Sequence, residues 1–174
     1  MKSIQSDDFE LFELTQRFAQ DRAQLDARWK DLQREVHPDK FAGQDAAAQR
    51  VAMQWSVRIN EAYQRLKDPL KRAAYLCELN GAPVNAENNT AMPAAFLMQQ
   101  MQWREELDEA KNAKDLQQIS QQVQQARRGM LENIERLIDL QHAFDEAVAQ
   151  VRALMFVERF EDDVNTRLDQ IETF

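Results

Sequence analysis

The chain has 174 residues, a formal net charge of −8, three glycines and four prolines. This length allows one domain or two small ones, and so few glycines and prolines leave little room for the turns of a β protein. The negative charge argues against generic attraction to a nucleic-acid backbone, and one cysteine with two histidines excludes an internal disulfide and a cysteine-histidine zinc site.

The first fourteen residues are acidic, with neither a long apolar run nor an arginine-rich amphipathic face. We therefore expect no export or organelle signal, and cytoplasmic residence fits the cysteine usage. No stretch of the sequence is long and apolar enough to span a membrane.

Ser6, followed by Asp7 and Asp8, predicts the start of a short first helix, because a side-chain oxygen can cap it and acids complement its dipole.

Two long helical patterns then flank a short polar turn. The first starts at Asp21 and carries an apolar stripe at steps of three and four, made of Leu25, Trp29, Leu32 and Val36. The second starts after Gly43, with Asp45 as its cap, and ends before Pro69; its stripe is Val51, Trp55, Ile59, Ala62, Tyr63 and Leu66. Facing stripes with a short connection predict an antiparallel pair, closed by a brief helix that reaches Leu79.

The turn itself is Val36-His37-Pro38-Asp39-Lys40-Phe41. Pro38 lacks a backbone donor and biases His37 out of the helical region, so the first long helix should end near Val36. The turn then presents three polar side chains at its tip, His37, Asp39 and Lys40.

These residues resemble the signature of the J-domain co-chaperones, in which His-Pro-Asp joins two antiparallel helices. Asp8 to Phe12 is similar to the short first helix of that family, and Leu66 to Tyr75 to its closing segment. The family docks this turn, and the basic face of the helix before it, on a DnaK-like chaperone. The resemblance therefore implies a chaperone-binding surface made of His37, Pro38, Asp39, Lys40, Arg28, Lys30 and Arg34. From the residues alone, the helix cations could instead form surface pairs with Asp26, Asp31 and Glu35.

The composition changes between Asn80 and Ala91, where turn-forming and weakly helical polar residues gather. We place a linker at 80–91, between a J-domain over 1–79 and a second domain over 92–174. Three helical patterns fill the second domain, over Met92 to Ala113, Asp115 to Leu140 and Asp145 to the end. The predicted fold is all-α, an N-terminal J-domain plus a C-terminal three-helix bundle.

The first bundle helix has two apolar faces. At about 100° per residue, one face is a seam of Met92, Phe96, Trp103, Leu107 and Ala110. Leu97, Met98 and Met101 fall on the other side, beside Glu105. A contiguous exposed apolar patch marks an interaction site, and the flexible methionine side chain suits one. Alternatively both faces are buried, one in the bundle and one against the J-domain.

Ala95 to Met98 and Arg104 to Ala110 resemble the matching helix of the HscB family, J-proteins of iron-sulfur cluster assembly, and the resemblance extends from Asp8 to Phe174. In that family the bundle binds the cluster scaffold protein IscU, which implies a scaffold-binding surface of Leu97, Met98, Met101, Gln102, Arg104, Glu105 and Phe156. Met101 stands where leucine is usual, and Gln102 where an acid is common. The cysteine metal module of eukaryotic relatives is missing, which favours a bacterial-type protein.

The resemblance implies a co-chaperone with no catalytic residue, metal or cofactor of its own. It would stimulate the ATPase of a HscA-type DnaK-like chaperone and deliver IscU to it. One alternative is a J-protein that serves another client. An enzyme using His37 and Asp39 would lack an accompanying nucleophile, metal cluster or glycine-rich loop, and the acidic charge argues against a helix-turn-helix DNA binder.

Overall fold

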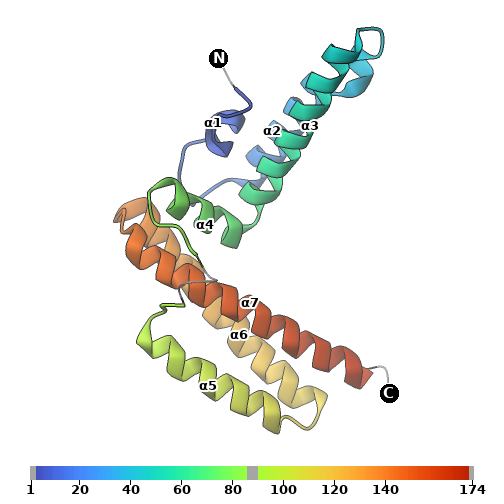
Figure 1. The fold of residues 1–174 in the computed structure, drawn as a ribbon. Coiled ribbons are helices and arrows are strands. Elements are labelled where there is room, and N and C mark those ends of the chain that lie inside the picture. The colour runs from blue at the N-terminus through green and yellow to red at the C-terminus, as the bar shows by residue number, and fades with distance from the viewer. Residues whose placement is uncertain (1–2, 86–89, 173–174) are drawn as a thin grey trace. The chain divides into compact units, whose positions relative to one another are not determined.

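The structure is a computed structural model that describes residues 3–85 and 90–172. The chain divides into two compact units, Met1–Leu76 and Cys77–Phe174. Every regular element in the described ranges is helical, so the all-α prediction is confirmed (Figure 1). Within those same ranges, no helix combines the length and the apolar character needed to cross a membrane.

The first unit is built around the antiparallel pair of α2 (Arg22–Val36) and α3 (Ala46–Lys67). The predicted start of each helix is confirmed, since the Asp21 carboxylate accepts from the amide of Ala23 and the Asp45 carboxylate from that of Ala48. A short 3₁₀ turn, η1 (Pro38–Phe41), joins the two helices. The short helix α1 (Asp8–Phe12) begins one residue later than Ser6 predicts, because Asp7 supplies its cap.

Buried apolar residues fill the space between α1, α2 and α3. α1 contributes Phe9, Leu11 and Phe12, and the hairpin contributes Leu25, Leu32, Ile59, Ala62 and Leu66. The prediction that Val51 belongs to this stripe is wrong, because its side chain is exposed and Ala52 is buried instead. At about 100° per residue, Ala52 points within about 20° of Ile59, whereas Val51 points about 80° away.

A buried carboxylate anchors α1 to the hairpin, which the sequence analysis did not anticipate. Asp8 is fully buried, and its two oxygens meet Arg65 Nε at 2.6 Å and Arg58 Nη2 at 2.8 Å. The Tyr75 hydroxyl of α4 (Pro69–Leu79) accepts from the Asp8 amide at 3.0 Å. The hydrogen bond to Asp8 raises the pKa of Arg65, and burial raises the pKa of Tyr75. Asp8 thus connects α1 to α3 through its carboxylate and to α4 through its backbone amide.

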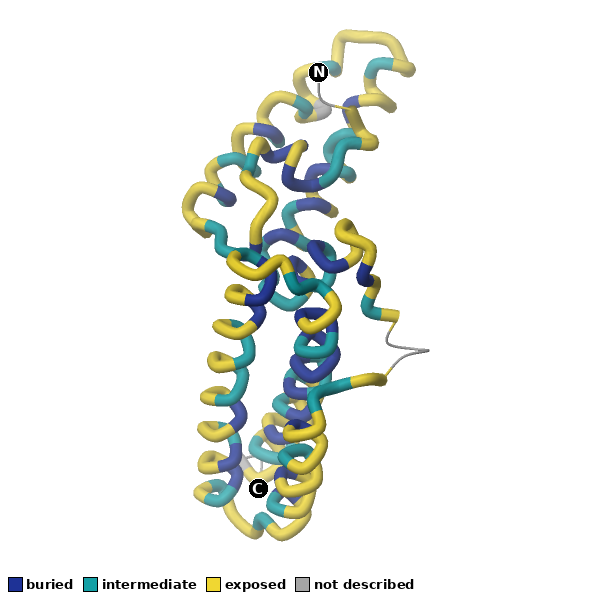
Figure 2. Tube along the Cα trace, turned by 90° about the vertical axis from the view of Figure 1, so that its left-hand side faces the viewer, coloured by how far each residue is buried: buried dark blue, intermediate teal, exposed yellow. Residues whose placement is uncertain are grey.

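The second unit contains α5 (Ala94–Glu109), α6 (Ala113–Glu135), the π-helical turn η2 (Arg136–Leu140) and α7 (Phe144–Glu172). α6 and α7 lie side by side and α5 runs along them, as a three-helix bundle requires (Figure 1). Buried positions recur on one side of each long helix, with exposed positions on the other (Figure 2). The buried seams include Leu116, Ile119, Val123 and Ile134 of α6 and Val151, Leu154, Val157, Phe160 and Val164 of α7.

The boundary between the first two bundle helices differs from the prediction. α5 begins at Ala94, after Pro93, and ends at Glu109, four residues before the predicted end. α6 begins two residues earlier than predicted, because the Asn112 side chain accepts from the Asp115 amide at 2.9 Å and caps the helix. An asparagine three residues before an acid is a local start signal that the periodicity of the neighbouring helices concealed.

Two arginines of α7 fix a connecting segment and the end of a neighbouring helix. Arg152 is buried. Its guanidinium donates to the carbonyls of Val84 and Ala91, at 3.0 and 3.3 Å, and both carbonyls belong to the segment predicted as a linker. Residues 86–89 of that linker lie outside the described residues. Arg167 donates to the carbonyls of Leu107 and Ala110 at 3.1 and 3.3 Å and so holds the end of α5.

Candidate functional site

The polar turn at the tip of the hairpin is ordered by its own hydrogen bonds. His37 Nδ1 accepts from the Asp39 amide at 3.2 Å, and the His37 carbonyl accepts from the Lys40 amide at 3.0 Å. Pro38 occupies the first position of η1, where its missing donor costs nothing. The side chain of Gln49 in α3 donates to the carbonyls of Phe41, Ala42 and Gln44 and secures the chain that follows the turn.

The Asp39 carboxylate points into solvent. Its side chain is 93% exposed, and its Oδ2 lies 3.6 Å from His37 Nδ1. His37 and Lys40 are also exposed. A short hydrogen-bonded turn therefore presents an anionic group whose oxygens remain open to a cation or donor from outside the molecule.

The three predicted cations of α2 have different surroundings. Lys30 and Arg34 are exposed, and Arg34 lies 3.7 Å from Asp31, a loose surface pair. Arg28 is half-buried, donates through Nε to the Phe12 carbonyl at 2.9 Å, and pairs with the Glu13 carboxylate. Lys30 and Arg34 are thus open to a partner, whereas Arg28 already holds the end of α1.

The two apolar faces predicted for α5 are confirmed. Phe96, Trp103 and Leu107 are buried in the bundle. Leu97, Met98 and Met101 are 48%, 75% and 74% exposed. We call these three residues the outer strip. Within the second unit, the outer strip is therefore not part of the packed core.

The polar residues predicted beside the outer strip are exposed as well. Gln102 donates to Glu106 Oε1 at 3.2 Å, one turn along the same helix, and Glu105 is exposed. The strip therefore places exposed apolar residues next to groups that can form hydrogen bonds, an arrangement typical of protein-binding surfaces.

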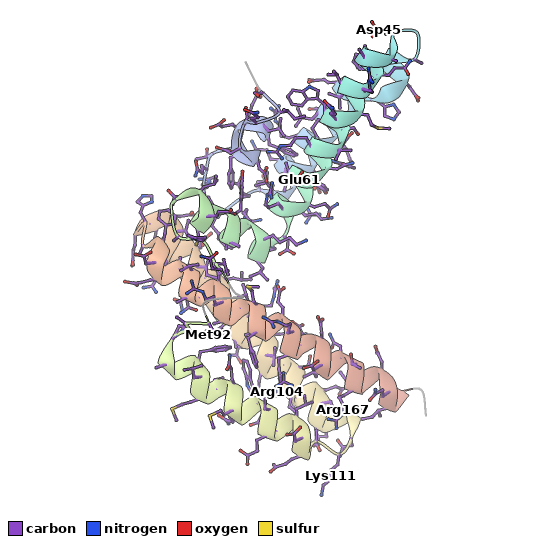
Figure 3. All side chains as sticks on the ribbon, viewed as in Figure 1. Asp45, Glu61, Met92, Arg104, Lys111 and Arg167 are labelled. Atoms are coloured by element: carbon purple, nitrogen blue, oxygen red, sulfur yellow. The ribbon has the colours of Figure 1, made fainter. Side chains whose placement is uncertain are left out.

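A cluster of aromatic rings joins α5 to α7 and brings Arg104 and Phe156 together. Trp103 stacks on Phe160 with 5.7 Å between ring centres, and Phe96 meets the edge of Phe156 at 5.9 Å. Phe156 is half-buried, at the border of its own seam. The Arg104 guanidinium lies over Phe156 and Phe160, 5.6 and 5.3 Å from their centres. Arg104 itself is labelled in Figure 3.

Arg104 also has an ionic partner that the sequence analysis missed. Its Nη1 lies 3.0 Å from Asp163 Oδ2 on α7. The two residues are 59 positions apart, and no local pattern in the sequence pairs them. A surface charge on α7 that faces α5 could be recognised only once the two helices were aligned.

The described residues offer no ligand set for a metal ion, since nowhere do three histidine, cysteine, aspartate or glutamate side chains converge. Cys77 is free and buried, and burial raises the pKa of its thiol to about 11. Such a thiol stays protonated at neutral pH, so it is a poor nucleophile and a poor metal ligand. The candidate features that remain are the exposed turn at the hairpin tip and the outer strip of α5.

Comparison with known proteins agrees with this description. A family model described as "HSCB C-terminal oligomerisation domain" matches residues 92–165. The chain is 45% identical to the co-chaperone protein HscB homolog of Burkholderia multivorans, over 99% of this chain and 100% of that protein, and 47% identical to that of Burkholderia thailandensis, over 99% of each.

Two solved structures have the same fold. The chaperone HscB from Vibrio cholerae superposes with a TM-score of 0.83 at 34% identity, covering 95% of this chain and 99% of that one. The human co-chaperone protein HscB superposes with a TM-score of 0.88 at 26% identity, covering 95% and 84%. These relatives are named for a co-chaperone role rather than a catalytic one, and the chain belongs to the HscB family of co-chaperones.

Proposed function

We propose that the chain stimulates the ATPase of a HscA-type DnaK-like chaperone and delivers to it the iron-sulfur scaffold protein IscU. The observation that carries the proposal is that each unit exposes the central residues of its predicted binding surface. The first unit presents the Asp39 carboxylate on an ordered turn, and the second presents the outer strip of Leu97, Met98 and Met101.

The chaperone contact centres on Asp39. An exposed carboxylate on a hydrogen-bonded turn can form a charge-assisted hydrogen bond with a basic residue of the chaperone's ATPase domain, and such a bond strengthens when water is excluded. Lys30 and Arg34 supply positive charge along α2 that would steer an acidic surface of the partner. Arg28 already uses two of its donors within the unit, so we expect it to contribute less.

The scaffold contact centres on the outer strip. Its methionines are flexible and polarizable, so they can fit an apolar surface on a client. Gln102, Arg104, Glu105 and Phe156 would contribute to the edge of the contact. The apolar residues would supply most of the binding free energy, while the polar residues would fix the orientation of the client.

Delivery needs no catalytic chemistry in this account. A chain that holds the scaffold through one unit and the chaperone through the other raises the effective concentration of each partner near the other. We place this exchange in the cytoplasm, where a single buried thiol stays reduced.

The test is ATP turnover by a purified HscA-type chaperone with and without this protein. The parent chain should stimulate turnover, and Asp39→Asn should lose most of the stimulation, because the amide keeps the shape of the turn but not its charge. Asp108→Asn removes the same charge from an exposed position on α5 and should behave like the parent. Full stimulation by Asp39→Asn would refute the role given to the turn.

A further inference from the structure

Asp163 on α7 lies at the edge of the proposed scaffold surface, where it meets Arg104 of α5 at 3.0 Å. We infer that Asp163 is a positioning residue of the scaffold-binding surface. It holds the Arg104 guanidinium over Phe156 and Phe160, so the surface that receives the scaffold extends from α5 onto α7. This inference rests on the proposed function and adds a residue to its second site.

The geometry explains why Arg104 needs a partner to stay in place. Its side chain is about half exposed, and a long exposed side chain samples many rotamers unless something fixes it. The faces of the Phe156 and Phe160 rings attract the Arg104 cation. A ring face does not fix the direction in which the guanidinium N–H groups point. The carboxylate on the neighbouring helix does, because a guanidinium donates in fixed directions within its plane.

The pair also determines which chemical groups suit the site. Among the described residues, Asp163 is the acceptor that Arg104 uses, and it takes up one of the two terminal nitrogens. The other N–H groups of Arg104 have no acceptor in the part of the chain that the structure describes, and the positive charge of the guanidinium is already balanced. Such a donor suits a backbone carbonyl or a neutral side-chain acceptor of the scaffold better than a second carboxylate.

A purely stabilising role for the pair is disfavoured by its exposure. Side chains that are 48% and 50% exposed form a surface ion pair, and such pairs contribute little to folding stability. Removing Asp163 should therefore leave the bundle folded and release the Arg104 side chain. The cost should appear in scaffold binding, where Arg104 must be ordered again.

The experiment is calorimetric titration of the full chain with purified IscU. Asp163→Asn should bind about three- to tenfold more weakly, the cost of ordering one long side chain, with an unchanged melting temperature. Asp162→Asn removes the same charge from the adjacent, exposed position of α7 and should bind like the parent. Parent-like binding by Asp163→Asn would overturn the inference. Absence of scaffold binding by the parent chain would instead overturn the proposed function itself.

A charge swap tests whether the ion pair acts by orienting Arg104 or only by linking the two helices. Arg104→Asp combined with Asp163→Arg restores an ion pair between α5 and α7 but moves the guanidinium to the other helix. The swapped protein should keep the parent's melting temperature and bind no better than Asp163→Asn. Recovery of parental affinity would show that any bridge between the helices suffices, which contradicts a positioning role.

Discussion

Substitutions in the outer strip of α5 should weaken scaffold binding much more than they lower the folding stability of the free protein. Met98 and Met101 are about three-quarters exposed, so the free protein holds only about a quarter of the roughly 1.5–3 kcal/mol that full burial of each would contribute. Replacing both with alanine should therefore cost under about 1.5 kcal/mol of folding stability, partly offset by the higher helix propensity of alanine. Burying the exposed three-quarters of each side chain against the scaffold would contribute about 1–2 kcal/mol of binding free energy for each methionine.

The double variant Met98→Ala with Met101→Ala should bind IscU at least about thirtyfold more weakly, since roughly 2 kcal/mol or more is lost and each 1.4 kcal/mol is a factor of ten. Calorimetric titration measures the affinity, and thermal unfolding followed by circular dichroism measures the stability. Trp103→Ala is the contrasting variant on the same helix, because its side chain is buried and its loss should cost about 3–5 kcal/mol of stability. Unchanged affinity in the folded double variant would refute the assignment of the strip.

Three further predictions concern other parts of the chain. Asp8→Asn should destabilise the first unit by about 2–4 kcal/mol in chemical denaturation, because Arg58 and Arg65 lose the anion between them; a change under about 0.5 kcal/mol would contradict its anchoring role. Asn112→Ala should cost about 0.5–2 kcal/mol through the lost cap of α6, and an unaltered denaturation midpoint would show that the cap is dispensable. Burial raises the pKa of Cys77 from 9.0 to about 11, so its contribution to stability is complete below about pH 9 and is lost as the pH rises toward 11. Native protein should accordingly resist thiol alkylation at pH 8, whereas equal labelling rates in native and denatured protein would disprove that burial.

The hairpin and its tip could be predicted because their signals are local. Asp21 and Asp45 act on amides two and three residues away, and Pro38 limits the residue beside it. The repeat of apolar residues then assigns a buried face to each helix. The same local reasoning predicted the exposure of Met98 and Met101, because the seam of α5 already occupied the opposite side.

Partners that are distant in sequence could not be predicted in this way. In the sequence, Asp8 indicates only the start of a helix. In the folded unit, Arg58 and Arg65 lie beside it, although they are 50 and 57 positions further along the chain. Arg28 reads as a surface cation until the end of α1 supplies acceptors for it. In each case the charge was visible in the sequence, but its role depends on which helix lies across from it.

The error at Val51 has a different origin. A stripe at steps of three and four permits two neighbouring positions near the end of a helix, and the more hydrophobic of the two is Val51. The structure selects Ala52, whose direction matches Ile59. The step pattern alone therefore does not identify the buried residue near the end of this helix.

The central claim is that both surfaces must act from one chain, and complementation in trans tests it most directly. ATP turnover by a HscA-type chaperone is measured with IscU present, using the parent, each single-site variant, and an equimolar mixture of Asp39→Asn with the Met98→Ala, Met101→Ala double variant. The account predicts that the parent gives scaffold-dependent stimulation, while the mixture gives only the stimulation seen without scaffold, because neither chain carries two working surfaces. A mixture as active as the parent would contradict the claim.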